Sequence, residues 1–332
     1  MKEYQETVGI DVSKETLDAH LHQKGTFTKV KNDKDGFISL IKWVTKTSGF
    51  GKDSVFWCFE HTGIYSLQLA AFLTEKKIPF AIVPPLQVKK SLGMIRGKND
   101  KIDARRLSEY AYLRRHKLQQ TVLPSKTILK MKDLLTLRER MVSHRAGYIT
   151  SSKEMKTVLG VSESAVLIST QQQLIKALTK SINQVENQII DLIKEDENIL
   201  KTYKLLVSIV GIGFVVAASL IVVTNCFTGF QNSRQLACYS GIAPFEKQSG
   251  TSLQVKSKVS PYANKRLKAL LDRSASTAIQ NDPELRLYYE RRLQAGKSPR
   301  STINIVRNKI LHRVFAVVKR ETPYVKIYRH AA

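Results

Sequence analysis

Thr7-Val8-Gly9-Ile10-Asp11-Val12-Ser13 is a short, mostly apolar run that carries one acid near its end. Its β-branched residues and polar flanks predict a buried strand. Residues 17–22 and 26–30 read as a hairpin that follows it, and residues 55–59 and 80–83 are further apolar runs. Helical patterns separate these later strands, and strands that alternate with helices are typical of an α/β sheet with helices on its faces. We therefore expect an α/β domain over residues 1–120.

Acidic residues lie at the ends of two of the expected strands. Asp11 is near the end of the first, and Glu60 directly follows the run at 55–59. Functional groups of α/β sheets gather at the carboxyl ends of the strands. For Asp11 the plain alternative is an ordinary turn residue, and for Glu60 it is an acid that caps a helix.

Two more acids follow the third of these strands, in Arg96-Gly97-Lys98-Asn99-Asp100-Lys101-Ile102-Asp103-Ala104-Arg105-Arg106-Leu107. If Asn99 caps a helix, then Asp100 and Asp103 lie on the same face as Leu107 and Tyr110. We expect this apolar face, acids included, to point at the body of the domain. The plain alternative is that acids in a first helical turn only complement the helix dipole.

Four carboxylates at one place would repel one another, and divalent cations are the natural remedy. Oxygen-only ligands favour Mg²⁺ or Mn²⁺, and two such ions can stabilise the attacking and leaving oxygens of a phosphate. The sequence thus predicts a catalytic metal site whose ligands are Asp11, Glu60, Asp100 and Asp103.

The charge of the chain indicates a polyanionic partner. Its 332 residues include 54 Lys and Arg against 28 Asp and Glu, a formal net charge of +26. The excess is concentrated in two regions, with ten Lys and Arg against three acids in residues 86–118 and sixteen against four in residues 254–320. Nucleic acid is the first candidate for this partner, and an anionic membrane surface is the second. We expect nucleic-acid contacts from Lys89, Lys90, Arg96, Lys98, Arg105, Arg106, Lys265, Arg266 and Lys268.

Cysteine usage and hydropathy suggest a cytoplasmic protein. Cys58, Cys226 and Cys238 are odd in number and share no metal-ligand spacing, which favours free thiols in a reducing compartment. The one long apolar run, residues 205–223, is interrupted by Gly211 and Gly213. A buried hairpin of two helices is therefore a better interpretation than a membrane span.

Three motifs together resemble the DEDD transposases of bacterial insertion sequences, which are relatives of the Piv-type DNA invertases. They are Val8-Gly9-Ile10-Asp11-Val12-Ser13-Lys14, Glu60-His61-Thr62-Gly63 and Lys98-Asn99-Asp100-Lys101-Ile102-Asp103-Ala104. The resemblance implies an amino-terminal ribonuclease-H-like domain, similar to that of the Holliday-junction resolvase RuvC. It also implies a DNA recombinase that takes both donor and target DNA. We further expect a homo-oligomer, either a dimer or a dimer of dimers. A structured guide RNA encoded by the element is a further implied partner.

The middle of the chain, residues 121–203, reads as helical. Its second half carries a heptad spacing of apolar residues, namely Ile175, Leu178, Ile182, Val185, Ile189 and Leu192. Such a seam predicts a coiled coil. It can join two subunits or close a helical hairpin within one chain, and we favour a seam that also makes a dimer.

Residues 204–332 resemble the carboxy-terminal, mainly α-helical transposase domain of the same family. Gly211-Ile212-Gly213 resembles a helix-hairpin-helix turn, whose backbone N–H groups can hold a DNA phosphate, although a tight turn between two core helices would use the same glycines. In the family a serine before a glycine is taken to attack DNA. Ser249 occupies that position, and Ser240 is a competitor because it also precedes a glycine.

The expected function is therefore that of an insertion-sequence transposase, which cuts and rejoins DNA by phosphodiester transesterification. One alternative is a metal-dependent endonuclease that resolves branched DNA with water as the nucleophile. A protein that binds nucleic acid without catalysis is another, but the four acids argue against it.

Overall fold

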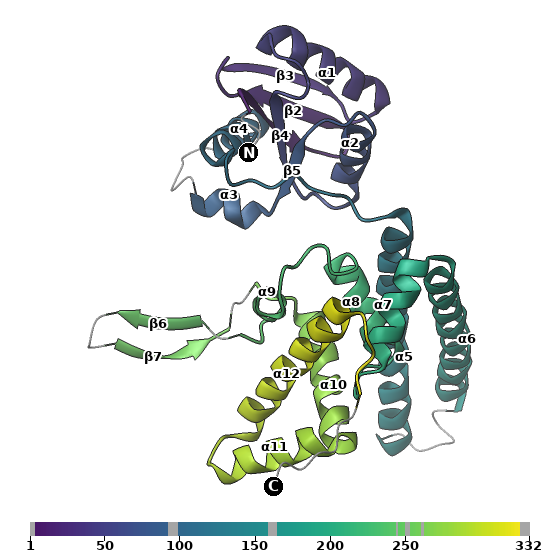
Figure 1. Cartoon of the computed structure of the whole chain (residues 1–332). Coiled ribbons are helices and arrows are strands. Elements are labelled where there is room, and N and C mark those ends of the chain that lie inside the picture. The colour runs from purple at the N-terminus through teal and green to yellow at the C-terminus, as the bar shows by residue number, and fades with distance from the viewer. Residues whose placement is uncertain are drawn as a thin grey trace. The chain divides into compact units, whose positions relative to one another are not determined.

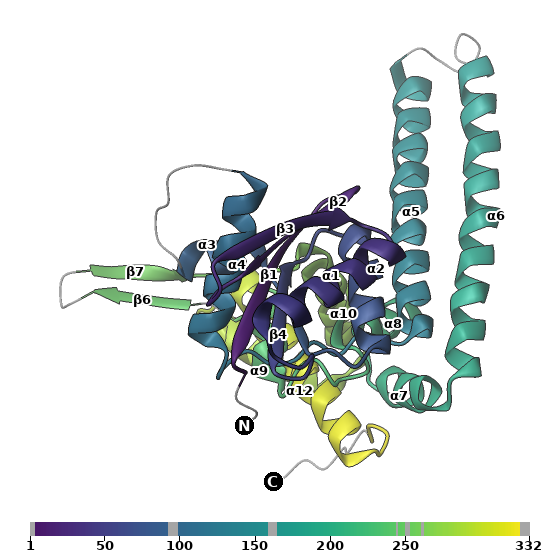
Figure 2. The ribbon, with the colours of Figure 1, turned by 90° about the horizontal axis from the view of Figure 1, so that it is seen from above.

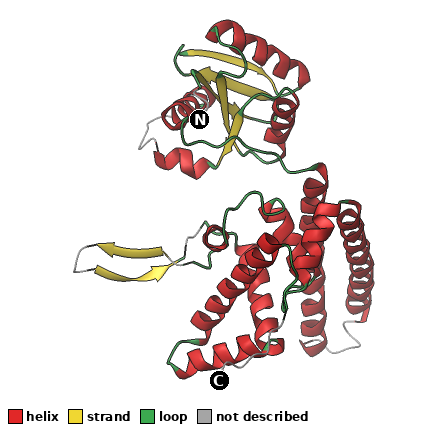
Figure 3. Ribbon diagram, viewed as in Figure 1, coloured by secondary structure: helices red, strands yellow, loops and turns green. Residues whose placement is uncertain are grey.

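Five strands form one mixed sheet in the first part of the chain, in the spatial order β3-β2-β1-β4-β5. The first three strands form an antiparallel meander, and β4 and β5 run parallel to β1 (Figures 1 and 3). The strands are β1 (Glu6–Val12), β2 (Thr16–Leu21), β3 (Thr26–Lys31), β4 (Val55–Glu60) and β5 (Phe80–Val83). The hairpin and the three further strands that the sequence predicts are thus confirmed.

The computed structural model describes residues 4–91, 99–158, 165–243, 245–249, 253–259 and 262–325, without the side chains of 245–249 and 253–258. The chain divides into two compact units, the first ending at Leu123 and the second beginning at Pro124. The separate status of residues 121–203 as a domain stays a prediction.

The sheet of the first unit has helices on both faces, because its strands alternate apolar residues between two cores. Val8, Ile10 and the other side chains on the same face of the sheet pack against α1 (Lys34–Ser48) and α2 (Ile64–Glu75). Side chains on the other face of the sheet, such as Phe56 and Cys58, pack against α3 (Pro85–Ser91) and α4 (Asp100–Arg114). The first unit is therefore a mixed α/β domain. Its strand order is consistent with a ribonuclease-H-like fold.

The contact between α4 and β1 is unusually close. Gly9 permits it, because a Cβ atom there would lie 2.0 Å from the backbone nitrogen of Ser108 and 2.3 Å from the carbonyl oxygen of Ala104. Thr7 Oγ1 also donates a hydrogen bond to the carbonyl oxygen of Ser108, at 2.8 Å. The helix that carries Asp100 and Asp103 is thus seated directly on the strand that carries Asp11.

In the described residues of the second unit, all elements are helices except the hairpin of β6 (Phe245–Ser249) and β7 (Leu253–Lys258). Helix α8 (Phe214–Thr224) is mostly buried, and it packs against α5, α7 and α10. Within the described residues the elements are α5 (Lys126–Val158), α6 (Ala165–Glu195), α7 (Glu197–Val207), α8 (Phe214–Thr224), α9 (Ser233–Tyr239), β6 (Phe245–Ser249), β7 (Leu253–Lys258), α10 (Lys265–Asn281), α11 (Pro283–Gln294) and α12 (Pro299–Arg320).

The heptad seam of α6 closes a hairpin within the chain. Figure 2 shows α5 and α6 running side by side, and seam residues Ile182, Val185 and Ile189 are buried. Arg138 of α5 also pairs with Glu186 of α6, at 2.6 Å. These seam residues thus pack within the chain, whereas Ile175 and Leu178 are half-buried. That the seam also joins two subunits stays a prediction.

The apolar run at 205–223 forms parts of two helices with a short connection between them, as the sequence predicts. It spans the end of α7, a short connection and most of α8. In the described part of the chain, none of the helices combines the length and the apolar character that crossing a membrane requires.

Candidate active site

Asp11 and Glu60 lie beside each other because β1 and β4 are parallel neighbours. The register pairs Ile10 with Phe59, so the next residue of each strand is one of the two acids. Asp11 lies two residues after Gly9, and Glu60 lies two residues after Cys58. Both therefore face the side of the sheet that α4 covers.

The first turn of α4 supplies the other two acids. Asn99 caps this helix, and its side-chain oxygen accepts a hydrogen bond from the backbone N–H of Lys101 at 2.7 Å. Leu107 and Tyr110 are buried as expected, but the side chain of Asp100 is 64% exposed and that of Asp103 is 31% exposed. The expectation that both acids point into the domain is therefore wrong for Asp100. Helix α4 rests on the sheet from Ala104 onward, and its first turn lies beyond that contact.

The four acids act on one another electrostatically. Burial raises the pKa of Asp11 to about 6, with further contributions from the charges of Asp100, Asp103 and Asp18. The pKa of Glu60 is also raised, first by burial and then by Asp11 and Asp103. The residues chosen from the sequence thus gather at one locus, where negative charge is costly.

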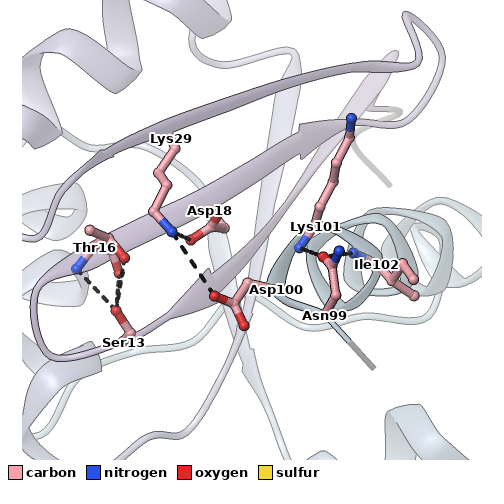
Figure 4. A network of polar contacts seen from close by, with 8 residues as sticks. All are labelled: Ser13, Thr16, Asp18, Lys29, Asn99, Asp100, Lys101 and Ile102. Carbon is pink, nitrogen blue, oxygen red and sulfur yellow. Dashed lines mark hydrogen bonds and ion pairs between the residues drawn. The ribbon is translucent and has the colours of Figure 1, made fainter. Parts of the chain in front are cut away.

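Basic side chains hold two of these acids. Lys29 of β3 lies 3.1 Å from Asp18 and 4.0 Å from Asp100, and Figure 4 shows its ammonium group between the two carboxylates. Arg106 pairs with Asp103 at 2.9 Å. The sequence reasoning missed Asp18 and Lys29. Their signal was the alternation along the predicted hairpin, which turns Asp18 to the same face as Asp11 once the pairing register is known.

The donor chemistry of this cluster fits a hard divalent cation, since its members are carboxylates. Among the described residues, however, no group of three or more His, Cys, Asp or Glu side chains is close enough to hold a metal ion. The acids are therefore gathered without being arranged as a finished metal site.

The two candidate serines differ in their environment. Ser240 is fully buried, and its hydroxyl donates to the carbonyl oxygen of Leu236 at 2.7 Å, within the last turn of α9. That hydroxyl contributes to the helix end and has no access to a substrate. Ser249 is the last residue of β6 and is paired with Leu253 of β7, and its side chain lies outside the described residues. It belongs to the second unit, whereas the four acids belong to the first.

The basic residues chosen from the sequence divide into three groups. Lys89 and Lys90 of α3, Arg105 of α4 and Lys265 of α10 are exposed, and Lys268 is half-buried. Arg106 and Arg266 are engaged in ion pairs, Arg106 with Asp103 at 2.9 Å and Arg266 with Glu139 of α5 at 2.8 Å. Arg266 also donates to the carbonyl oxygen of Leu135 at 2.7 Å. Arg96 and Lys98 lie outside the described residues.

The two glycines between α7 and α8 serve different purposes. Gly211 has a positive φ of 92°, and a Cβ there would lie 2.4 Å from the carbonyl oxygen of Ser274 in α10. It therefore lets the turn pack on a core helix. Gly213 is exposed, and a Cβ there would meet no described atom within 4 Å. It is the N-cap residue of α8, and the space beside it is open at that helix end.

Comparison with known proteins places the chain in one family. Residues 8–159 match a family described as "Transposase", and residues 203–290 match "Transposase IS116/IS110/IS902 family". The pilin gene-inverting protein of Moraxella lacunata is 30% identical over 328 residues, which cover 96% of this chain and 97% of the relative. The protein of the same name from Moraxella bovis is 29% identical over the same shares. An uncharacterized 43.6 kDa protein of insertion element IS110 from Streptomyces coelicolor is 30% identical over 154 residues, covering 46% of this chain and 38% of the relative. With both matched regions in one chain and a relative similar along nearly its whole length, this protein belongs to the IS110/IS116 family of transposases and is a DNA recombinase.

Proposed function

We propose that the four acids of the first unit, with Mg²⁺ or Mn²⁺, and Ser249 of the second unit together cut and rejoin DNA strands. The observation that carries the proposal is the gathering of Asp11, Glu60, Asp100 and Asp103 at one end of β1 and β4. Burial, with added repulsion from neighbouring acids of the cluster, raises the pKa values of Asp11 and Glu60. A ribonuclease-H-like fold of the first unit is part of this proposal, since its strand order fits that fold.

The metal ions would be held by the carboxylates of these four residues. When bound, they would stabilise the charge that develops on the attacked phosphate. Their positive charge would also offset the mutual repulsion of the acids. Carboxylates as the sole protein donors favour the hard ions Mg²⁺ and Mn²⁺.

Ser249 is the nucleophile in this proposal, and the burial of Ser240 supports the choice. Its Oγ would bond to phosphorus while the bond from phosphorus to a sugar oxygen breaks. The hydroxyl proton would leave to a nearby base, and the departing sugar oxygen would take up a proton. A phosphoserine link keeps the energy of the phosphodiester, so that a sugar hydroxyl can later displace the serine and rejoin the strand.

The names of the relatives support rejoining over simple hydrolysis. The Moraxella proteins are named for inverting a pilin gene, and a gene cannot be inverted unless its ends are rejoined. A junction endonuclease that uses water would leave broken strands.

Nucleic acid is the proposed partner of the basic surfaces. Donor DNA, target DNA and a structured guide RNA would contact exposed residues such as Lys89, Arg105 and Lys265, and the N-terminus of α8 at Gly213. Assembly as a dimer or a dimer of dimers, in the cytoplasm and near the nucleoid, is also proposed. That the seam of α6 contributes to this assembly stays a prediction.

The deciding experiment is a search for a covalent protein–DNA adduct. RNA that copurifies with the protein would first be sequenced, and DNA that matches it would be prepared with a nick that traps the intermediate. We expect an adduct that maps to Ser249 and requires a divalent metal. Metal-dependent cleavage without any adduct would instead establish the hydrolytic junction endonuclease.

A further inference from the structure

Three charged residues form a row across the first three strands. The register pairs Asp11 of β1 with Asp18 of β2, and Asp18 with Lys29 of β3. Directly opposed residues share a face of the sheet and are close enough to interact. Asp18 and Lys29 therefore continue the acidic cluster sideways from Asp11, although neither is one of its four proposed metal ligands.

Asp18 anchors Lys29. The side chain of Asp18 is only 6% exposed, and a buried carboxylate needs a partner to offset the loss of water. Lys29 provides that partner at 3.1 Å, while its own side chain remains half-exposed. The ammonium group is thus held at a defined place beside the cluster instead of extending freely into solvent.

The anchored ammonium group also reaches a proposed metal ligand. Lys29 Nζ lies 4.0 Å from Asp100 Oδ2 (Figure 4). On the same helix turn, Arg106 holds Asp103 at 2.9 Å. Two of the four acids are therefore engaged by protein cations.

We propose that Asp18 and Lys29 are positioning residues that set the metal affinity of the cluster, with Lys29 competing with the divalent ion for Asp100. Asp18 keeps the ammonium group in place, and Lys29 holds Asp100 while no metal is bound. A metal ion that takes Asp100 must displace this contact, after which Lys29 stays paired with Asp18. The inference rests on the proposed metal site and adds to it the residues that control its affinity.

Binding of Mn²⁺ to the full-length chain tests the proposal, measured by calorimetry and by the electron paramagnetic resonance signal of free Mn²⁺. The measurement is made at pH 8, above the raised pKa of Asp11 of about 6. Lys29→Met should bind Mn²⁺ about tenfold more tightly, the effect of removing a unit charge roughly 6 Å from a dication in a water-like dielectric. Lys29→Arg keeps the charge and should bind like the wild type.

Asp18 gives the opposite sign. Asp18→Asn removes a negative charge and weakens the anchor, so it should bind Mn²⁺ several-fold more weakly. The double variant Asp18→Asn/Lys29→Met restores the charge balance and should return close to the wild type. Lys31→Met is the matched control, because Lys31 lies two residues along on the same face of β3, and its affinity should change little.

Asp11→Asn separates the two possible failures. If it binds Mn²⁺ like the wild type, the bound ions are elsewhere and the proposed metal site itself is wrong. If it loses binding but Lys29→Met binds no more tightly than the wild type, only the role of Lys29 is refuted. Circular dichroism checks that each variant is folded, and Lys29→Gln replaces Lys29→Met if the latter does not fold.

Discussion

Replacing Gly9 by alanine should disturb the candidate active site, because Gly9 packs against the helix that carries Asp100 and Asp103. The new Cβ would lie 2.0 Å from the backbone nitrogen of Ser108 and 2.3 Å from the carbonyl oxygen of Ala104, whereas ordinary contacts begin near 3.4 Å. Backbone atoms cannot rotate away as a side chain can. Helix α4 must therefore move, and it carries Asp100 and Asp103 with it.

The size of the effect follows from this displacement. Overpacking of a core costs about 1–3 kcal/mol, and a clash with backbone should lie at the upper end of that range. Removing the glycine returns at most about 1 kcal/mol through the lower entropy of the unfolded chain. We therefore expect a net loss of about 2 kcal/mol. A shift of catalytic groups by about 1 Å costs roughly 100-fold in rate, so metal-dependent strand cleavage should fall by that factor.

Two assays are used. Thermal unfolding is monitored by circular dichroism, and strand cleavage is measured under single-turnover conditions. Gly51→Ala is the matched control, because it lies in the same unit, has no positive φ and would meet no described atom within 4 Å. It should leave both measurements near the wild type. A Gly9→Ala protein with unchanged melting temperature and unchanged cleavage would falsify the reasoning that this contact positions the acids.

Three further predictions concern the acids, the serine and the charge. Burial and neighbouring acids raise the folded-state pKa of Asp11 from 3.8 to about 6, so ionising it costs stability as the pH rises from about 4 to 6. Without metal at pH 7, Asp11→Asn should then have a higher melting temperature than the wild type, and equal melting temperatures would contradict the raised pKa. With metal present, the same variant should lose strand cleavage. Ser249→Ala should keep nucleic-acid binding and form no covalent adduct. Ser240→Ala should still form the adduct and should lose about 1 kcal/mol of stability with its hydrogen bond. If Ser249→Ala forms the adduct and Ser240→Ala does not, Ser240 is the nucleophile. The affinity for nucleic acid should fall steeply with salt, and Lys89→Ala or Lys265→Ala should each make the log–log slope shallower by roughly 0.7–0.9, whereas a slope near zero in the wild type would show that the charge serves another purpose.

Local patterns in the sequence were enough to predict the strands, most of the helices and the four acids. The alternation of apolar runs with turns predicts β1, β4 and β5, and the position of an acid at the end of a parallel strand predicts convergence with its neighbour. Asn99 could be recognised as a helix cap because capping depends only on the next few residues. These features depend on contacts within a strand, a helix turn or a repeated motif, which a linear pattern records.

Contacts between distant segments were decided only by the tertiary structure. The row of Asp11, Asp18 and Lys29 depends on the register of three strands, and a slip of one residue would have turned each side chain to the other face. Gly9 reads as one more strand residue until α4, about a hundred positions later, packs on it. The seam of α6 could have faced another subunit or α5 with the same heptad spacing. The sequence by itself determined which residues could form the site, and packing determined which ones meet, because the free energy of a contact depends on where both partners lie in space.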